Sequence, residues 1–164
     1  MLQFKEFVYY GKHAKYAHFL AKEQGGRLRE DGVNVFNRLL DVYLVGAAIG
    51  IRRGVTASID NSISDKATIQ LQQIVNVSDD LEYLYRLIML LDDTQKLSEK
   101  ERISRAFKAD DDPEQFKVNM KLFNSYALGG LEILYEYFKD DVGQPERIRE
   151  DIIKLVDDYY IENL

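Results

Sequence analysis

The stretch VFNRLLDVYLVGAAIGIRRG, residues 35–54, decides how the rest of the chain is interpreted. Its core, residues 39–51, carries Asp41 as its only charge and is apolar on every helical face. That pattern is typical of a helix buried on most sides. Arg52 and Arg53 follow in the last turn, where cations suit the helix dipole. The apolar core is shorter than the roughly 20 residues that span a bilayer, so we expect the central helix of a soluble bundle.

Two glycines in this helix indicate close packing. Gly46 and Gly50 are four residues apart and share one helical face. Each costs about 1 kcal/mol of helix stability relative to alanine, so we expect another helix to cross there at short range. Gly129 and Gly130 are the candidate partners on a later helix. The sequence leaves open whether these glycine faces meet within one chain or between chains.

Composition limits the class of protein. The chain has 164 residues, of which 46% are hydrophobic and 30% charged, and residues 1–164 are expected to form a single globular domain. It has no cysteine, which excludes disulfides, thiolate metal sites and cysteine catalysis. Lys5 and Glu6 interrupt the apolar start, so no signal peptide is predicted and a cytoplasmic location is expected.

Apolar periodicity predicts an all-α fold, a single compact bundle of six or seven helices around the buried helix at about 35–53, with no confident strand. The predicted helical segments are 4–24, 35–53, 66–75, 81–91, 97–110, 114–140 and 146–163. The inner face of 97–110 is predicted to carry Ile103, Ala106 and Phe107. The last helix is predicted to bury Ile148, Ile152, Leu155, Val156 and Tyr159.

Local signals fix some helix starts and pairs. Ser98 and Glu101 have the spacing of a capping box. Three aspartates before Pro113 are typical of an acidic helix N-terminus rather than a calcium loop, which needs a different ligand spacing. Glu82 and Arg86 are one turn apart and are predicted to form an ion pair.

No catalytic or metal-binding motif is evident. His13 and His18 are five residues apart, which does not suit a metal, so we expect surface or half-buried histidines. Glu132 and Glu136 lack the Glu-x-x-His partners of di-metal bundles. The pairs Asp79-Asp80, Asp92-Asp93, Asp140-Asp141 and Asp157-Asp158 are expected to be helix caps and solvated ends. We therefore predict no enzyme activity, catalytic residue, cofactor or metal.

Charge is distributed unevenly along the chain. Residues 1–60 hold nine Lys/Arg against six Asp/Glu, whereas residues 61–164 hold thirteen against twenty-two. Any contact with nucleic acid is therefore expected in the first third. The candidate contact residues for a partner or for nucleic acid are Arg52, Arg53, Lys12, Lys15, Arg27 and Arg29. For the arginine pair, simple stabilisation of the helix end remains an equal alternative.

Three segments carry a resemblance to a known family. They are LLDVYLVGAAIGIRRG (39–54), LEYLYRLIMLLDD (81–93) and MKLFNSYALGGLEILYEYF (120–138). Together they resemble small helical proteins associated with bacterial DNA phosphorothioation and related anti-phage defence cassettes. Ile51 stands where that pattern has an aromatic residue.

The resemblance implies a non-enzymatic accessory or assembly subunit that works beside a larger nuclease, ATPase or DNA-modifying enzyme. DNA would then be reached through the partner, and a homo-oligomer stays open. The alternative from the residues is a small DNA-binding or regulatory protein that uses its basic N-terminal third directly.

Overall fold

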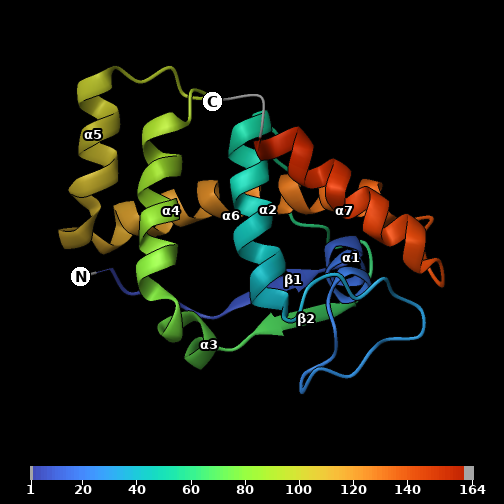
Figure 1. Ribbon diagram of the computed structural model, residues 1–164. Coiled ribbons are helices and arrows are strands. Elements are labelled where there is room, and N and C mark those ends of the chain that lie inside the picture. Colours follow the sequence, from blue (N-terminus) through green and yellow to red (C-terminus); the bar gives the residue numbers. More distant parts are fainter. Residues whose placement is uncertain (1, 161–164) are drawn as a thin grey trace.

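The computed structural model describes residues 2–160, and a crossing of two helices, α2 and α6, lies at its centre (Figure 1). The described chain is predominantly helical, as predicted, with seven α-helices, one 3₁₀ helix and one small sheet. The elements are β1 (Phe7–Tyr10), α1 (Lys12–Leu20), α2 (Leu39–Arg53), β2 (Lys66–Ile69), α3 (Leu71–Asn76), α4 (Ser78–Leu91), α5 (Glu99–Phe107), η1 (Ala109–Asp111), α6 (Pro113–Phe138) and α7 (Pro145–Tyr160).

Glycines let α2 and α6 touch backbone to backbone. A methyl group on Gly46 would lie 2.8 Å from the carbonyl oxygen of Ala127, and one on Gly50 would lie closer still to that of Tyr126. A methyl group on Gly130 would overlap the carbonyl oxygen of Gly46. The expected contact between the two glycine faces is therefore confirmed, and it lies within one chain.

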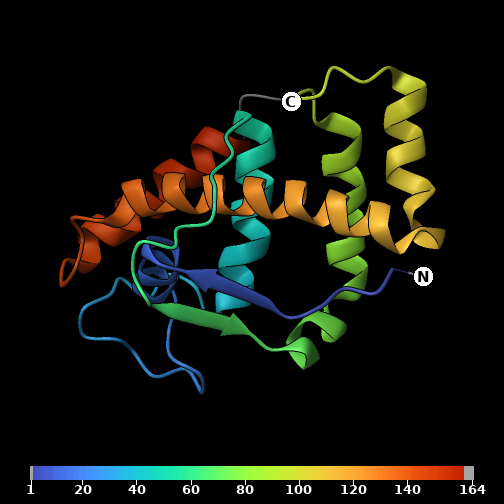
Figure 2. The same ribbon diagram turned by 180° about the vertical axis from the view of Figure 1, so that it is seen from behind.

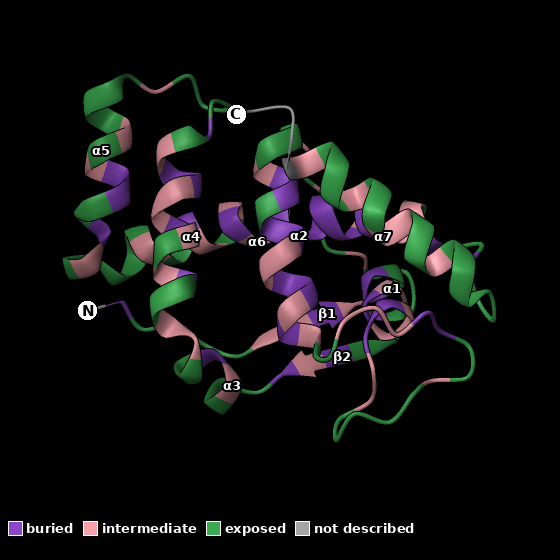
Figure 3. Cartoon of the chain, in the orientation of Figure 1, coloured by how far each residue is buried: buried purple, intermediate pink, exposed green. Residues whose placement is uncertain are grey.

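The other elements pack around this crossing. Figure 2 shows α6 lying across both α2 and α4, with α5 outside α4 and the sheet below. At the opposite end of α6 lie α1 and α7. The burial colouring of Figure 3 places the buried residues along the faces where these elements meet. The largest fully buried side chains are aromatic: Tyr9, Tyr43, Tyr85, Tyr126, Phe123 and Phe138.

The expectation of no strand is wrong, and of the helix predicted over 4–24 only Lys12–Leu20 is helical, with Gly11 just before its start. Residues 7–10 form β1, which pairs antiparallel with β2 so that Phe7 lies opposite Ile69. The run Phe-Val-Tyr-Tyr suits a pleated, half-buried surface better than a helix. Gly11, at φ 60°, then turns the chain into α1.

Strand β2 likewise replaces the first turn of the helix predicted over 66–75, and only Leu71–Asn76 is helical there. The central helix begins at Leu39 rather than at 35. The preceding residues are extended because Phe36 exchanges backbone hydrogen bonds with the end of α1, at Leu20 and Lys22. This pairing takes the first predicted turn of α2 out of the helix.

The predicted inner face of α5 is confirmed for Ala106 but wrong for Ile103 and Phe107. Ile103 and Phe107 are exposed, at 47% and 51%, whereas Arg105 and Ala106 are buried. Arg105 donates to the carboxylate of Asp92 over 3.0 Å and to the carbonyl oxygen of Met89 over 2.6 Å. Because a buried carboxylate needs a charged partner, the arginine takes the inner position that an apolar residue was expected to fill.

Two aspartates expected at solvated helix ends are buried. Asp92 is 1% exposed and also accepts hydrogen bonds from Tyr126 and Thr94. Burial opposes its ionisation, but the hydrogen bonds from Tyr126, Thr94 and Arg105 outweigh burial and lower its pKa. Asp141, in the turn after α6, is likewise 1% exposed.

The outer helices are less buried than predicted. In α7, Ile148, Ile152, Leu155 and Tyr159 pack against the core but are only partly buried, and Val156 is 52% exposed. The predicted end of this helix, residues 161–163, lies outside the described residues.

The local signals are confirmed where the structure tests them. Ser98 and Glu101 form the capping box of α5, and Asp112 caps α6 ahead of Pro113. Arg86 pairs with Glu82 at 2.6 Å.

Within residues 2–160, no helix combines the length and apolarity needed to cross a membrane.

Candidate functional site

Arg52 and Arg53 are exposed at the end of α2, where they meet α7. The guanidinium of Arg52 lies 5.6 Å from the ring centroid of Tyr159, and Arg53 donates to the Tyr159 hydroxyl over 3.3 Å. Both arginines therefore hold the last turns of α7 as well as facing solvent. Whether they also contact a partner or nucleic acid stays a prediction.

Lys12 and Lys15 lie on α1. The ammonium of Lys12 is 2.9 Å from Oε1 of Glu132, and Nε2 of His13 is 2.8 Å from the same oxygen. Burial opposes the ionisation of Glu132, but hydrogen bonds from Lys12 and His13 outweigh burial and lower its pKa. Lys12 thus anchors α1 to α6, whereas Lys15 is exposed. The expectation of a surface or half-buried histidine is wrong for His13, which is fully buried.

Arg27 and Arg29 lie in the loop between α1 and α2. Arg27 is largely exposed, with its side chain at 83%. Arg29 donates to the carbonyl oxygen of Ala21 over 3.2 Å and so helps to fold the loop. This loop leads into the first turn of α2, whereas Arg52 and Arg53 lie at the last turn, roughly 20 Å away along the helix (Figure 1). The structure does not gather the six predicted basic residues into one site.

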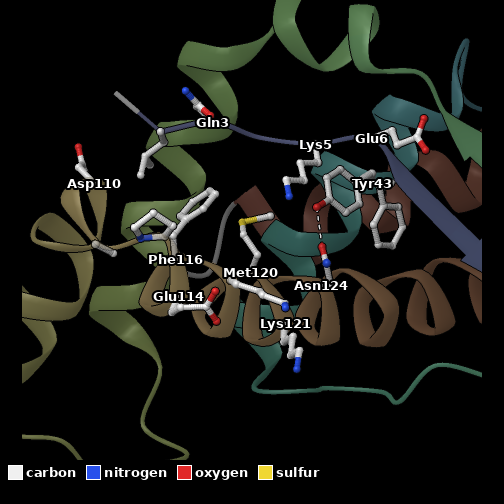
Figure 4. A pocket seen from close by; sticks show the side chains of 15 residues that line it. Gln3, Lys5, Glu6, Tyr43, Asp110, Glu114, Phe116, Met120, Lys121 and Asn124 are labelled. Atoms are coloured by element: carbon white, nitrogen blue, oxygen red, sulfur yellow. Dashed lines mark hydrogen bonds between the residues drawn. The ribbon is translucent and has the colours of Figure 1, made fainter.

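A trough lies instead between the N-terminal residues and the first half of α6 (Figure 4). Its cavity measures about 630 Å³, within the range of ligand-binding pockets. One wall is the extended segment 2–6, which we call the strap, and the opposite wall is α6. Phe7, Tyr43, Phe116 and Met120 are among the residues that line it. The Tyr43 hydroxyl donates to Oδ1 of Asn124 over 2.6 Å, and burial raises the Tyr43 pKa, so this hydroxyl stays protonated.

Charged side chains surround the trough. Lys5, Lys117 and Lys121 line it, and within residues 2–160 none of the three forms an ion pair. In Figure 4, Lys5 points between the strap and α6, whereas Glu6 points away. Of the other acids in the lining, Asp110 is paired with Arg86 at 2.8 Å, and Glu114 lies on the α6 side.

A second feature is an exposed apolar surface on the outside of α4 and α5. We call it the α4–α5 outer face, and it consists of the exposed Tyr83, Leu91, Ile103 and Phe107 together with the half-buried Leu87. The three α4 residues are spaced four apart and share one helical face. Tyr83 is 72% exposed and Leu91 is 55% exposed. The guanidinium of Arg86, on α4, lies 5.0 Å from the ring centroid of Phe107, on α5, so Arg86 links the two helices beside this face.

His13 and Glu132 form an internal pair rather than an accessible acid–base site. Nε2 of His13 is held by Glu132, but the imidazole is fully buried, so it has no access to a substrate. In the part of the chain that the structure describes, no three histidine or acidic side chains are grouped closely enough to hold a metal. The pair therefore acts as a structural link between α1 and α6.

Sequence reasoning missed both surfaces. The helix predicted over 4–24 includes residues 4–6 of the strap, although Leu2 and Phe4 alternate with Gln3 and Lys5 as they would in an extended segment. The outer face was missed because the residues of α5 were assigned to the core. No sequence pattern indicates that Asp92 is buried, so the sequence could not predict that Arg105 turns inward to pair with it.

Comparison with known proteins identifies the family. The profile of DNA sulphur modification system-associated protein 4 matches residues 22–159, most of the chain. The chain belongs to this family. The resemblance drawn from three segments is thus confirmed over a much longer range, and the protein is associated with a DNA sulphur modification system. No curated protein and no solved structure matched the chain.

Proposed function

We propose that the protein is a non-enzymatic accessory subunit of a bacterial anti-phage defence or DNA-processing complex and acts through protein–protein contacts. The observation that carries the proposal is the α4–α5 outer face. Exposed apolar surface of this kind marks interaction sites on soluble proteins. Tyr83 is the most exposed of the large apolar side chains described, and tyrosine is frequent among residues that dominate binding energy.

The expected partner is a larger protein of the same system, such as a nuclease, an ATPase or a DNA-modifying enzyme. Family membership supports this because the family is named for its association with a multi-component system. DNA is then reached through the partner. The alternative of direct DNA binding has less support, because Lys12 and Arg29 make internal contacts and Arg52 and Arg53 lie far from the loop.

The test is affinity purification of the tagged protein from its native host, with and without nuclease, followed by mass spectrometry. We expect stoichiometric proteins of the modification system that survive nuclease treatment. The double variant Tyr83→Ser/Phe107→Ser should lose them, because it removes two exposed rings from the outer face without touching the core.

The matched control is Leu28→Ser, which removes an apolar side chain that is 63% exposed in the loop before α2. It should retain the partners. Circular dichroism should show that all variants keep their helix content. Partners that remain on the double variant, or that disappear with nuclease in the wild type, would contradict the proposal.

A further inference from the structure

The strap has an unused backbone edge. Residues 3–6 run without a helical turn into β1 (Figure 2), and within residues 2–160 their N–H and C=O groups form no hydrogen bond. The chain enters β1 directly afterwards, where Phe7 begins the pairing with β2. Unpaired backbone of this kind is a template for an added strand, because each N–H and C=O retains its capacity to pair.

The strap is also held firmly enough to act as a template. Leu2 is buried at 8% exposure, and the ring of Phe4 packs edge-on against Tyr85 and Phe116, with centroids 6.2 and 5.6 Å apart. These anchors fix the strap at one side of the trough. A bound segment therefore does not need to order the strap first, which reduces the entropy lost on binding.

The trough beside the strap favours one kind of occupant. Phe7, Phe116 and Met120 provide apolar contacts, and the ammonium of Lys5 points inward among them (Figure 4). Lys117 and Lys121 add two further cations one turn apart on α6. Successive side chains of a strand point to opposite faces, so a strand beside the strap presents alternate side chains to this lining.

We propose that the trough binds an extended segment of a partner protein, which pairs with the strap backbone and places an acidic side chain beside Lys5. This inference rests on the proposed function, because it gives the accessory subunit a second protein contact. The trough is separate from the α4–α5 outer face, and the two can be tested independently.

The test is selection of random peptides of about ten residues, displayed on phage, against the immobilised full-length protein. We expect enriched sequences with an Asp or Glu and with apolar residues two positions from it. In titration calorimetry, Lys5→Glu should weaken binding of a selected peptide by roughly tenfold, since attraction becomes repulsion. Lys100→Glu, the matched change of an exposed lysine on α5 outside the trough, should leave the affinity unchanged.

Backbone pairing has a separate readout. In the free protein the amide protons of residues 3–6 should exchange rapidly, and in the peptide complex alternate ones should become protected. Lack of enrichment, an affinity indifferent to Lys5→Glu, or binding without protection of the strap would each overturn the inference. If Tyr83→Ser/Phe107→Ser releases the native partners while the selected peptide still binds, the two surfaces act separately. If the native partners are retained on that variant, the proposed function fails at the outer face while the peptide result stands by itself.

Discussion

Replacing Gly130 with alanine tests the close crossing of α2 and α6, because the structure and helix propensity predict opposite changes in the free energy of unfolding. Helix propensity alone predicts stabilisation, because alanine is about 1 kcal/mol better than glycine inside a helix. The structure predicts the opposite. The new methyl group would overlap the carbonyl oxygen of Gly46, which belongs to the backbone of α2 and cannot rotate away.

The size of the stability loss depends on which parts of the structure must move to make room for the methyl group. Relief requires α2 and α6 to separate, and that loosens the buried side chains between them, among them Tyr43 and Phe123. Overpacking in a core costs about 1–3 kcal/mol or more, and separation adds lost contacts, so we expect a net loss of about 2–4 kcal/mol after the gain in propensity. For a chain of this size each kcal/mol lowers Tm by about 2–4 °C.

The assay is urea unfolding followed by circular dichroism, with the free energy of unfolding taken from midpoint and slope. Gly46→Ala should lower the free energy of unfolding by less, because its methyl group would lie 2.8 Å from the Ala127 oxygen. This second variant still tests the crossing if Gly130→Ala does not fold. Ala48→Gly, at an exposed position of α2, calibrates propensity and should lose about 1 kcal/mol. A Gly130→Ala midpoint equal to or above that of the wild type, with the slope unchanged, would refute the reasoning.

Three further predictions concern charged groups. Asp92→Asn should lower the free energy of unfolding by about 3 kcal/mol in the same urea assay, because it leaves the buried Arg105 without its counter-charge. The control Asp93→Asn changes an exposed residue and should alter the free energy of unfolding by less than about 0.5 kcal/mol. Burial is the main cause that raises the pKa of Asp141 to about 6, and the neighbouring Asp151 adds to it. Between about pH 4 and pH 6 the folded state therefore binds a proton that the unfolded state has lost, so the contribution of Asp141 to stability falls as the pH rises through this range. Asp141→Asn should therefore raise the free energy of unfolding by about 2 kcal/mol over the wild type at pH 7 and by less near pH 4. A difference in free energy between variant and wild type that does not change with pH would contradict this prediction. Fluorescence anisotropy with a DNA duplex should show no binding that weakens steeply with salt, and a steep slope that disappears in Arg52→Glu/Arg53→Glu would favour direct DNA binding instead.

The helices could be predicted because their signals are local. The capping box at Ser98 and the cap at Asp112 each depend on a few neighbouring residues, and both are present. The glycine faces of α2 and α6 were also predictable, since glycine inside an apolar helix needs a packing reason. The sheet was not predictable in this way, because β1 gains its hydrogen bonds from β2 nearly sixty residues later.

The candidate site was harder to predict than the fold. Clustering of basic residues in the first third suggested one surface, but contacts decide which charges remain free. Lys12 is engaged by Glu132 from α6, and Arg29 by the backbone of its own loop. Lys5 and Lys121 both line the trough although more than a hundred residues separate them. No pattern along the chain indicates that they share one site.

The position of α6 has a consequence for the order in which the protein is made. His13 contacts Glu132 across 119 residues, and Phe4 contacts Phe116. During synthesis the first twenty residues therefore leave the ribosome long before their partners exist. The contacts of α1 and the strap with α6 have to wait until α6 is made, and until then Phe4 is available to chaperones or to wrong partners.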